Sequence, residues 1–184
     1  METWACDAGM PFSVVGLQVM VEQVGNVDAL SRRLPLPLAR LAVRFLNARS
    51  ALERHQNAYY LWEAMLKLIG AVAIVECAER AADDAKLRDS LRNLVRPSVG
   101  HWWEFVRLIV PLLADSGDPG FVAVRDILLS TRTRHDMPLV AGLDAALISK
   151  LEGRAGSRTT VSPRDVFDRM VSYRNKGSGH GAFD

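Results

Sequence analysis

An arginine, an asparagine and a histidine near the carboxyl terminus have the types and spacing that chemistry on a phosphate group needs. Arg174 and Asn175 are adjacent, and five residues separate Arg174 from His180. Arg174 follows Met170 by four residues and Phe167 by seven, so it lies on the apolar side of its expected helix. A charge on that side needs a partner or a water-filled cleft. The sequence therefore predicts that Arg174 lies in a cleft, toward which His180 could return from beyond the helix end.

The pair Arg174 and His180 suits the cleavage of RNA without a metal ion. A guanidinium binds phosphate as a two-pronged fork, and an imidazole titrates near neutral pH. A base that removes the proton from a 2′-hydroxyl lets that oxygen attack the adjacent phosphate, while a cation stabilises the charge that builds up on the phosphate oxygens. Because the reaction needs the 2′-hydroxyl, this chemistry is restricted to RNA.

The motif also resembles a known family signature. Arg174-Asn175 followed by His180, at the end of the last helix of an all-α chain, is similar to the R-polar-x(4–6)-H motif of HEPN domains. The resemblance implies a metal-independent endoribonuclease or an RNA-binding relative, with Arg174 and His180 as the catalytic pair and Asn175 as the supporting polar residue. It further implies a homodimer that brings two motifs into one cleft, or assembly with another component of a prokaryotic defence or signalling system.

A non-catalytic function is the main alternative. In it the chain is an assembly or adaptor domain of a larger bacterial defence or signalling protein, and Arg174 organises an interface. The side chain of Arg174 would then pair with an acid such as Asp165 or Asp168, and His180 would be an ordinary loop histidine. A nuclease or toxin held inactive by a partner is a third alternative that the sequence does not separate from the first.

Other residues that could carry chemistry indicate no second site. The remaining histidines lack ligand spacing with one another, and the two cysteines form no CxxC pair, so we expect neither a metal nor a cofactor. These residues are His55, His101, His135, Cys6 and Cys77. Trp102 and Trp103 could line a stacking surface for bases, but their helical spacing favours core and rim positions. Tyr59, Tyr60 and Trp62 are interpreted in the same way.

Helical periodicity after residue 35 predicts the elements that position the motif. Leu61, Met65, Leu68, Val72 and Val75 recur in steps of four and three, which predicts a seam for antiparallel helix packing. The whole set of expected helices covers residues 38–48, 51–82, 85–95, 98–115, 121–129, 137–151 and 163–176. We therefore expect an all-α fold, a bundle of up-down antiparallel helices with a short N-terminal extension.

Glycine, proline and serine residues punctuate this pattern. Gly70 inside the long helix predicts a close helix approach, because glycine there costs about 1 kcal/mol relative to alanine. Pro111 should kink its helix or end the regular hydrogen bonding. Ser98 and Ser162 are the expected N-caps of their helices, and Pro163 suits the first helical position.

Composition bounds the remaining possibilities. The chain has 184 residues, 49% of them hydrophobic, and a net charge of +2, which predicts a folded protein of one domain. We expect a helical bundle at 35–184, HEPN-like by the resemblance of its motif, and an extension at 1–34 that packs on it. Basic residues are mostly arginine, so a local phosphate-binding patch is permitted. The longest apolar run, 68–75, is too short to cross a bilayer, and no signal peptide is visible. We therefore expect a cytoplasmic protein that makes no membrane contact.

Overall fold

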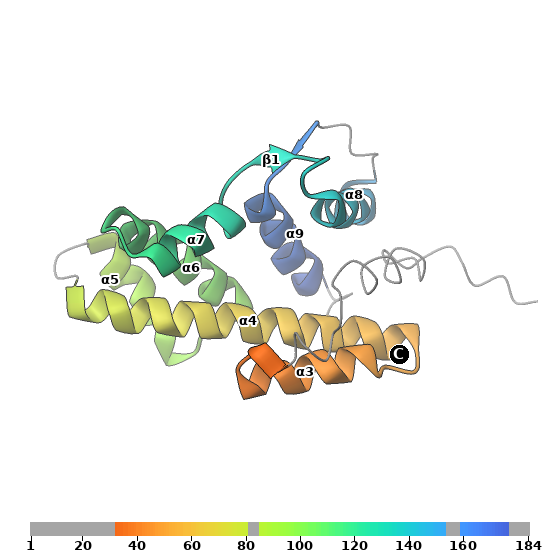
Figure 1. Ribbon diagram of the computed structural model, residues 1–184, viewed down its shortest axis with the longest axis horizontal. Helices are drawn as coiled ribbons and strands as arrows, with labels where there is room; N and C mark the ends of the chain where they lie inside the picture. The colour runs from red at the N-terminus through yellow and green to blue at the C-terminus, as the bar shows by residue number, and fades with distance from the viewer. Residues whose placement is uncertain (1–31, 81–84, 154–158, 177–184) are drawn as a thin grey trace, which may run out of the picture.

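The computed structural model describes residues 32–80, 85–153 and 159–176, and within them the chain is almost entirely helical (Figure 1). Those residues form seven α-helices, labelled α3 to α9, one short 3-10 helix and a ladder of two very short strands. The predicted all-α fold class is therefore confirmed. Residues 1–31, which make up most of the expected N-terminal extension, lie outside the described residues.

The first two helices form an antiparallel hairpin. Helix α3 spans Leu36–Leu46 and helix α4 spans Ala51–Arg80. The side-chain amide of Asn57 donates to the carbonyl of Arg44 at 3.2 Å, which fixes the register of the two helices. With these two residues opposite one another, α3 covers only the first half of α4, and the start of α3 lies near the middle of the longer helix.

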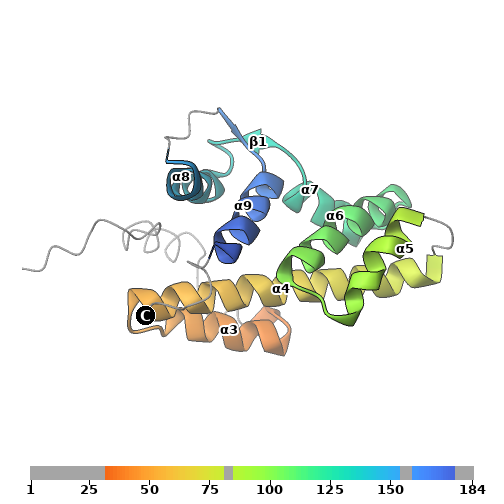
Figure 2. The same ribbon diagram turned by 180° about the vertical axis from the view of Figure 1, so that it is seen from behind.

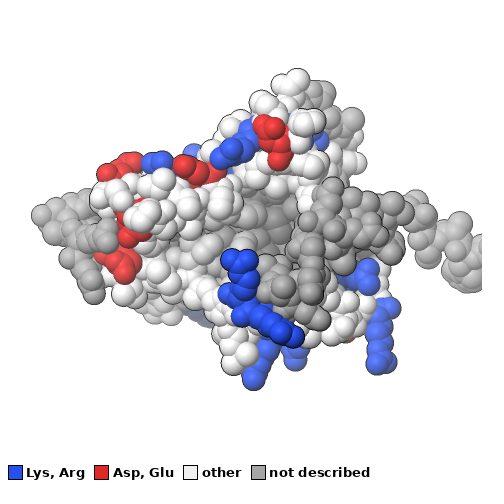
Figure 3. Space-filling model, viewed as in Figure 1, with Lys and Arg blue, Asp and Glu red and all other residues white. Residues whose placement is uncertain are grey.

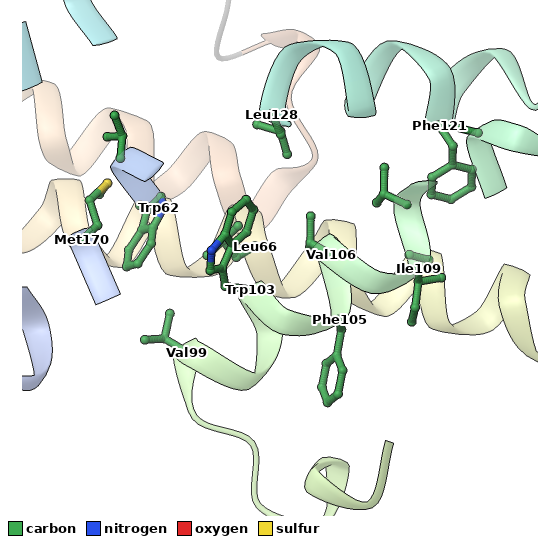
Figure 4. Close-up of a cluster of buried hydrophobic side chains, with 14 of the residues drawn as sticks. Trp62, Leu66, Val99, Trp103, Phe105, Val106, Ile109, Phe121, Leu128 and Met170 are labelled. Carbon is green, nitrogen blue, oxygen red and sulfur yellow. The ribbon is translucent and has the colours of Figure 1, made fainter. Parts of the chain in front are cut away.

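The core lies where α4 meets α6 and α7 (Figure 4). Helix α6 spans Val99–Asp115 and helix α7 spans Pro119–Leu128, while α5 (Ala85–Leu91) and the 3-10 helix η1 (Arg92–Val95) connect α6 to α4. Burial of apolar side chains from these helices supplies most of the driving force for folding. The largest fully buried side chains are those of Trp103, Phe105, Leu66, Ile109, Val99, Val106, Val110 and Val166.

The last two helices pack on one another and are tied together by the ladder. Helix α8 spans Pro138–Glu152 and helix α9 spans Pro163–Asn175. Strands β1 (Arg132–Thr133) and β2 (Thr160–Val161) pair antiparallel. Strand β1 precedes α8 by a short loop, and β2 ends directly before the N-cap of α9. Sequence analysis predicted no strand pair here, because a ladder of two residues per strand leaves no periodicity to detect.

Helix α4 is the axis of the molecule. Figures 1 and 2 show α3 along one side of α4, α7 and α9 on the side away from α3, and α8 beyond α9. Helix α9 crosses α4 at a steep angle rather than lying along it, so only part of the bundle follows the up-down arrangement. None of the helices in the described ranges is long and apolar enough to cross a lipid bilayer.

The predicted packing seam of α4 is wrong over its second half. Leu68, Val72 and Val75 are 39%, 48% and 60% exposed. The side chains of α4 that are buried instead form the adjacent stripe Tyr59, Trp62, Leu66, Ala73 and Cys77. Because α4 carries apolar residues around its whole circumference, spacing alone does not decide which stripe faces the core; contact with α6 decides it.

Close approach at Gly70 is confirmed. A Cβ atom added at Gly70 would lie 2.9 Å from Cε3 of Trp102 in α6, so any larger residue forces the indole ring to move. Helix α6 continues through Pro111 to Asp115. Leu112, directly after Pro111, is 46% exposed.

The two predicted serine caps differ in their contacts. Oγ of Ser98 accepts from the backbone N–H of His101 at 3.3 Å, and Nδ1 of His101 accepts from the N–H of Ser98 at 3.0 Å, which completes a capping box. Ser162 occupies the predicted N-cap position of α9, although its side chain makes no cap bond. Helix α9 begins instead with Pro163, whose fixed φ is already helical.

Candidate functional site

The structure places two of the three predicted motif residues at the end of α9. Arg174 lies in the last turn of the helix, and Asn175 is its final residue with an exposed side chain. Residues 177–184 lie outside the described residues, and His180 is among them. The proximity of Arg174 to His180 therefore stays a prediction.

Arg174 forms an ion pair with the long helix. Its side chain is 25% exposed, and its Nη2 atom lies 3.7 Å from Oε2 of Glu63 in α4. The other carboxylate oxygen of Glu63 lies 2.8 Å from Nζ of Lys67. Asp168, one of the acids expected to pair with Arg174, accepts hydrogen bonds from Trp103 and Arg107 instead. The apolar side of α9 thus faces α4, and Arg174 meets a carboxylate there.

Aromatic packing fixes the end of α9 against α4. The rings of Tyr173 and Tyr59 stack with centroids 6.0 Å apart and an interplanar angle of 29°. The hydroxyl of Tyr59 donates to the carbonyl of Met170 at 3.4 Å. The ring of His55 contacts that of Tyr173 edge-on at 5.9 Å. These contacts hold the last turn of α9, and with it the backbone of Arg174, in one position on α4.

The α4 side of the site is a single stripe. His55, Tyr59 and Glu63 follow one another in steps of four residues and therefore share one face of the helix. The last turn of α9 lies across that face and adds Tyr173 and Arg174. We call these five residues the α4–α9 site. An imidazole, two phenols, a carboxylate and a guanidinium meet there.

Burial decides the protonation states of the ring side chains in the α4–α9 site. Burial lowers the pKa of the His55 imidazole, which favours the neutral ring at neutral pH. Burial also raises the pKa of Tyr59, with a further upward effect from Tyr173 and an opposing effect of the Arg174 charge. The pKa of Tyr173 is raised by burial as well. The site at neutral pH therefore holds neutral phenols, a neutral imidazole that can accept a proton, and the positive charge of Arg174.

His55 and Glu63 belong to the site, although the sequence did not predict them there. The spacing of His55 to the other histidines indicated only that it is not a metal ligand. The detectable signal was the four-residue spacing of His55, Tyr59 and Glu63, but nothing in the sequence indicates that α9 covers that face. Within the described residues, no group of three or more histidine, cysteine, aspartate or glutamate side chains could hold a metal ion.

The other aromatic and histidine candidates lie outside the α4–α9 site. Trp103 is buried, and Trp102 is half-buried against Gly70, as expected for core and rim residues. His101 belongs to the capping box of α6. The side chain of His135 is fully exposed, 3.9 Å from Asp136. None of these residues adds a polar group to the α4–α9 site.

The α4–α9 site is thus defined by its own geometry: a partly exposed guanidinium beside a carboxylate, a neutral imidazole and two tyrosines, all held by one helix crossing. Such a group of side chains can bind an anion through Arg174 and accept a proton at His55. Comparisons of the chain with protein-family models, with curated proteins and with solved structures found no match.

Proposed function

We propose that this protein is an HEPN-like RNA-binding module that cuts RNA without a metal ion, and that Arg174 binds the phosphate at the cleaved bond. The observation that supports the proposal is the state of the Arg174 side chain. It is one quarter exposed at the end of the last described helix, and its contact to Glu63 at 3.7 Å is longer than a charge-assisted hydrogen bond. Toward the residues that the structure describes, donors of the guanidinium are therefore left for an anionic ligand.

The chemistry follows from a guanidinium and an imidazole on one phosphate. The imidazole accepts the proton of the 2′-hydroxyl, and the 2′-oxygen attacks the adjacent phosphorus. The bond to the 5′-oxygen of the next nucleotide breaks, that oxygen takes up a proton, and the products are a 2′,3′-cyclic phosphate and a 5′-hydroxyl. Arg174 stabilises the additional negative charge on the phosphate oxygens. His180 is the imidazole that the motif implies, and Asn175 supports the pair.

Cleavage of single-stranded RNA in EDTA tests the proposal. We expect products with 2′,3′-cyclic phosphate ends. Arg174→Ala should lower the rate about 10²–10³-fold, because it removes the cation that stabilises the transition state. His180→Ala should have an effect at least as large as that of the arginine variant. Product ends are identified by mass spectrometry, and circular dichroism checks that each variant is folded.

Arg164→Ala is the matched control, since Arg164 lies exposed in the first turn of the same helix. It should cut at the wild-type rate. A parallel His55→Gln variant shows whether the described imidazole contributes to the reaction. RNA that is cut equally by the wild type and by both the Arg174→Ala and the His180→Ala variants would rule out this assignment.

A second candidate function, assembly without catalysis, is favoured by a different observation. The apolar residues Leu68, Val72 and Val75 are exposed in the second half of α4, which α3 does not cover. Such a stripe is typical of a protein–protein contact. Because the HEPN resemblance implies a homodimer, the partner we propose for this face is the same face of a second copy.

The mass of the protein in solution tests the assembly function. We expect a dimer for the wild type and a monomer for Val72→Asp, because the change places a carboxylate in the middle of the apolar contact. Ile127→Asp in α7 is the matched control, since Ile127 is also an exposed apolar residue at 59%. It should remain a dimer. Static light scattering after gel filtration measures the mass, and a monomeric wild type contradicts the assembly function.

A further inference from the structure

Helix α3 and the residues that flank it carry a concentration of arginine that the α4–α9 site does not use. From residue 32 to residue 52 the chain has no aspartate, glutamate or lysine, yet it has five arginines. All five are exposed: Arg32, Arg33, Arg40, Arg44 and Arg49. We call these residues the α3 arginines. Figure 3 shows basic side chains gathered over α3, while the acidic ones in that view lie away from it.

The α3 arginines have few neighbours that could neutralise them. Within the described ranges, none of the five forms an ion pair. The nearest acids along the chain are Asp28 and Glu53, each four residues beyond one end of the group. The carboxylate of Glu53 accepts from the backbone N–H of Arg49 at 2.8 Å. Exposed arginines that are grouped together repel one another and attract counterions. A polyanionic ligand replaces those counterions, so such a group favours it.

The α3 arginines are spread along the length of α3. Arg40 and Arg44 are four residues apart, so they lie on the same face of α3 and about 6 Å apart along its axis. Arg33 precedes the helix and Arg49 follows it, so exposed arginines stand before, on and after α3. Several guanidiniums spread along one helix match the repeating phosphates of an extended strand better than they match a single anion.

Apolar surface alternates with the charges. A groove of about 630 Å³ lies on α3, and Arg40, Arg44, Leu36 and Val43 are among its lining residues. Leu36 is 64% exposed and Val43 is 42% exposed. Unstacked bases contact apolar side chains and stack on guanidinium planes, while their phosphates bind the charges. A double helix turns its bases inward and offers this surface only phosphates.

We propose that α3 is a binding site for single-stranded RNA, with the α3 arginines on its phosphates and Leu36 and Val43 on its bases. That the bound nucleic acid is RNA and not single-stranded DNA rests on the proposed function. The site is separate from the α4–α9 site, because α3 and α9 lie on different sides of α4 (Figures 1 and 2). The α3 site binds the single-stranded RNA and does not touch the reacting atoms.

Binding of a fluorescein-labelled 16-nucleotide RNA, measured by fluorescence anisotropy, tests the site. The RNA carries 2′-O-methyl groups, so it cannot be cut by attack of the 2′-oxygen and the result does not depend on whether the protein is a nuclease. We expect Arg40→Gln/Arg44→Gln to weaken binding about tenfold or more. The slope of log affinity against log salt should fall in magnitude by about 1.4, which corresponds to two lost phosphate contacts on a single strand.

Arg92→Gln/Arg132→Gln is the matched control, because it removes the same charge from two exposed arginines outside α3. It should bind like the wild type. Equal weakening by both double variants, or no weakening by either, overturns the α3 site. Anionic phospholipid vesicles that bind through Arg40 and Arg44 while the RNA does not also overturn it. If the RNA binds through α3 and unmodified RNA is never cut, the α3 site stands and the nuclease proposal fails.

Discussion

Asp144→Ala should lower the free energy of unfolding by about 3–5 kcal/mol, because the change leaves two guanidiniums without the carboxylate they share. Asp144 is 3% exposed in the middle of α8. Its Oδ1 accepts from Nη1 of Arg169 in α9 at 2.5 Å, and its Oδ2 lies 3.7 Å from Nη1 of Arg134, which follows β1. One side chain thus joins α8, α9 and the strand ladder.

The expected loss lies at the lower end of that range, because part of the interaction survives. Nε of Arg169 is also 3.5 Å from Oε1 of Glu152, and Nη2 of Arg134 donates to the carbonyl of Ala141 at 2.7 Å. Both arginines retain these contacts, and both are partly exposed to water. Asp144 is buried, unlike the two arginines, so its removal has the largest effect in the cluster.

Urea unfolding followed by circular dichroism measures the effect, and Asp126→Ala is the matched control. Asp126 is also a helical aspartate paired with an arginine, Arg125 at 3.1 Å, but its side chain is half-exposed. Exposed pairs contribute little, so Asp126→Ala should cost less than about 1 kcal/mol. If the two variants unfold at the same urea concentration, the carboxylate of Asp144 does not hold α8 and α9 together.

The cluster around Asp144 shows what spacing in the sequence could not predict. Helical periodicity predicted a helix at 137–151 correctly, and α8 spans Pro138–Glu152. It gave no sign that an aspartate within this helix is buried, because the partners of Asp144 come from other elements. Charged side chains are buried only where such partners converge, and convergence is a property of the fold.

The same limit applies to the α4–α9 site. The four- and seven-residue spacing of Arg174 from Met170 and Phe167 predicted the side of α9 on which the guanidinium lies, since it depends on one helix alone. The carboxylate that it meets, Glu63, depends on how α9 crosses α4. Helix α4 has apolar residues on every side, so its own pattern could not indicate which stripe faces α6 and α9 and which stays exposed.

Two sides of α4 therefore have different roles in the proposed function: one carries the reaction and the other carries α3. Helix α9 covers the stripe of His55, Tyr59 and Glu63, where the reaction is proposed, and helix α3 with its arginines lies on another side. A strand bound along α3 would have to pass around α4 to reach Arg174. Contacts that fix the crossing of α9 over α4 and α6 then matter for the site even where they lie far from Arg174, because they set where the strand meets the guanidinium.

Trp103 joins α9 to α6 at this crossing, and Trp103→Ala should lower the free energy of unfolding by about 3–5 kcal/mol. The indole is 1% exposed in α6. Its Nε1 donates to Oδ1 of Asp168 in α9 at 2.7 Å, and its ring packs edge-on against Phe167 with centroids 4.9 Å apart. Truncation opens a cavity between the two helices and also leaves the carboxylate of Asp168 with only Arg107, at 3.2 Å.

A double-mutant cycle separates the hydrogen bond from the packing. Trp103→Phe keeps an aromatic ring and removes the N–H, so it should cost about 1–3 kcal/mol, clearly less than alanine. Asp168→Ala should cost less in the Trp103→Phe background than in the wild type, by about 1 kcal/mol, because the bond it breaks is already absent there. Urea unfolding gives the four free energies. If the effects of Trp103→Phe and Asp168→Ala simply add, the indole and the carboxylate are not coupled, and packing against Phe167 alone sets the position of α9 on α6.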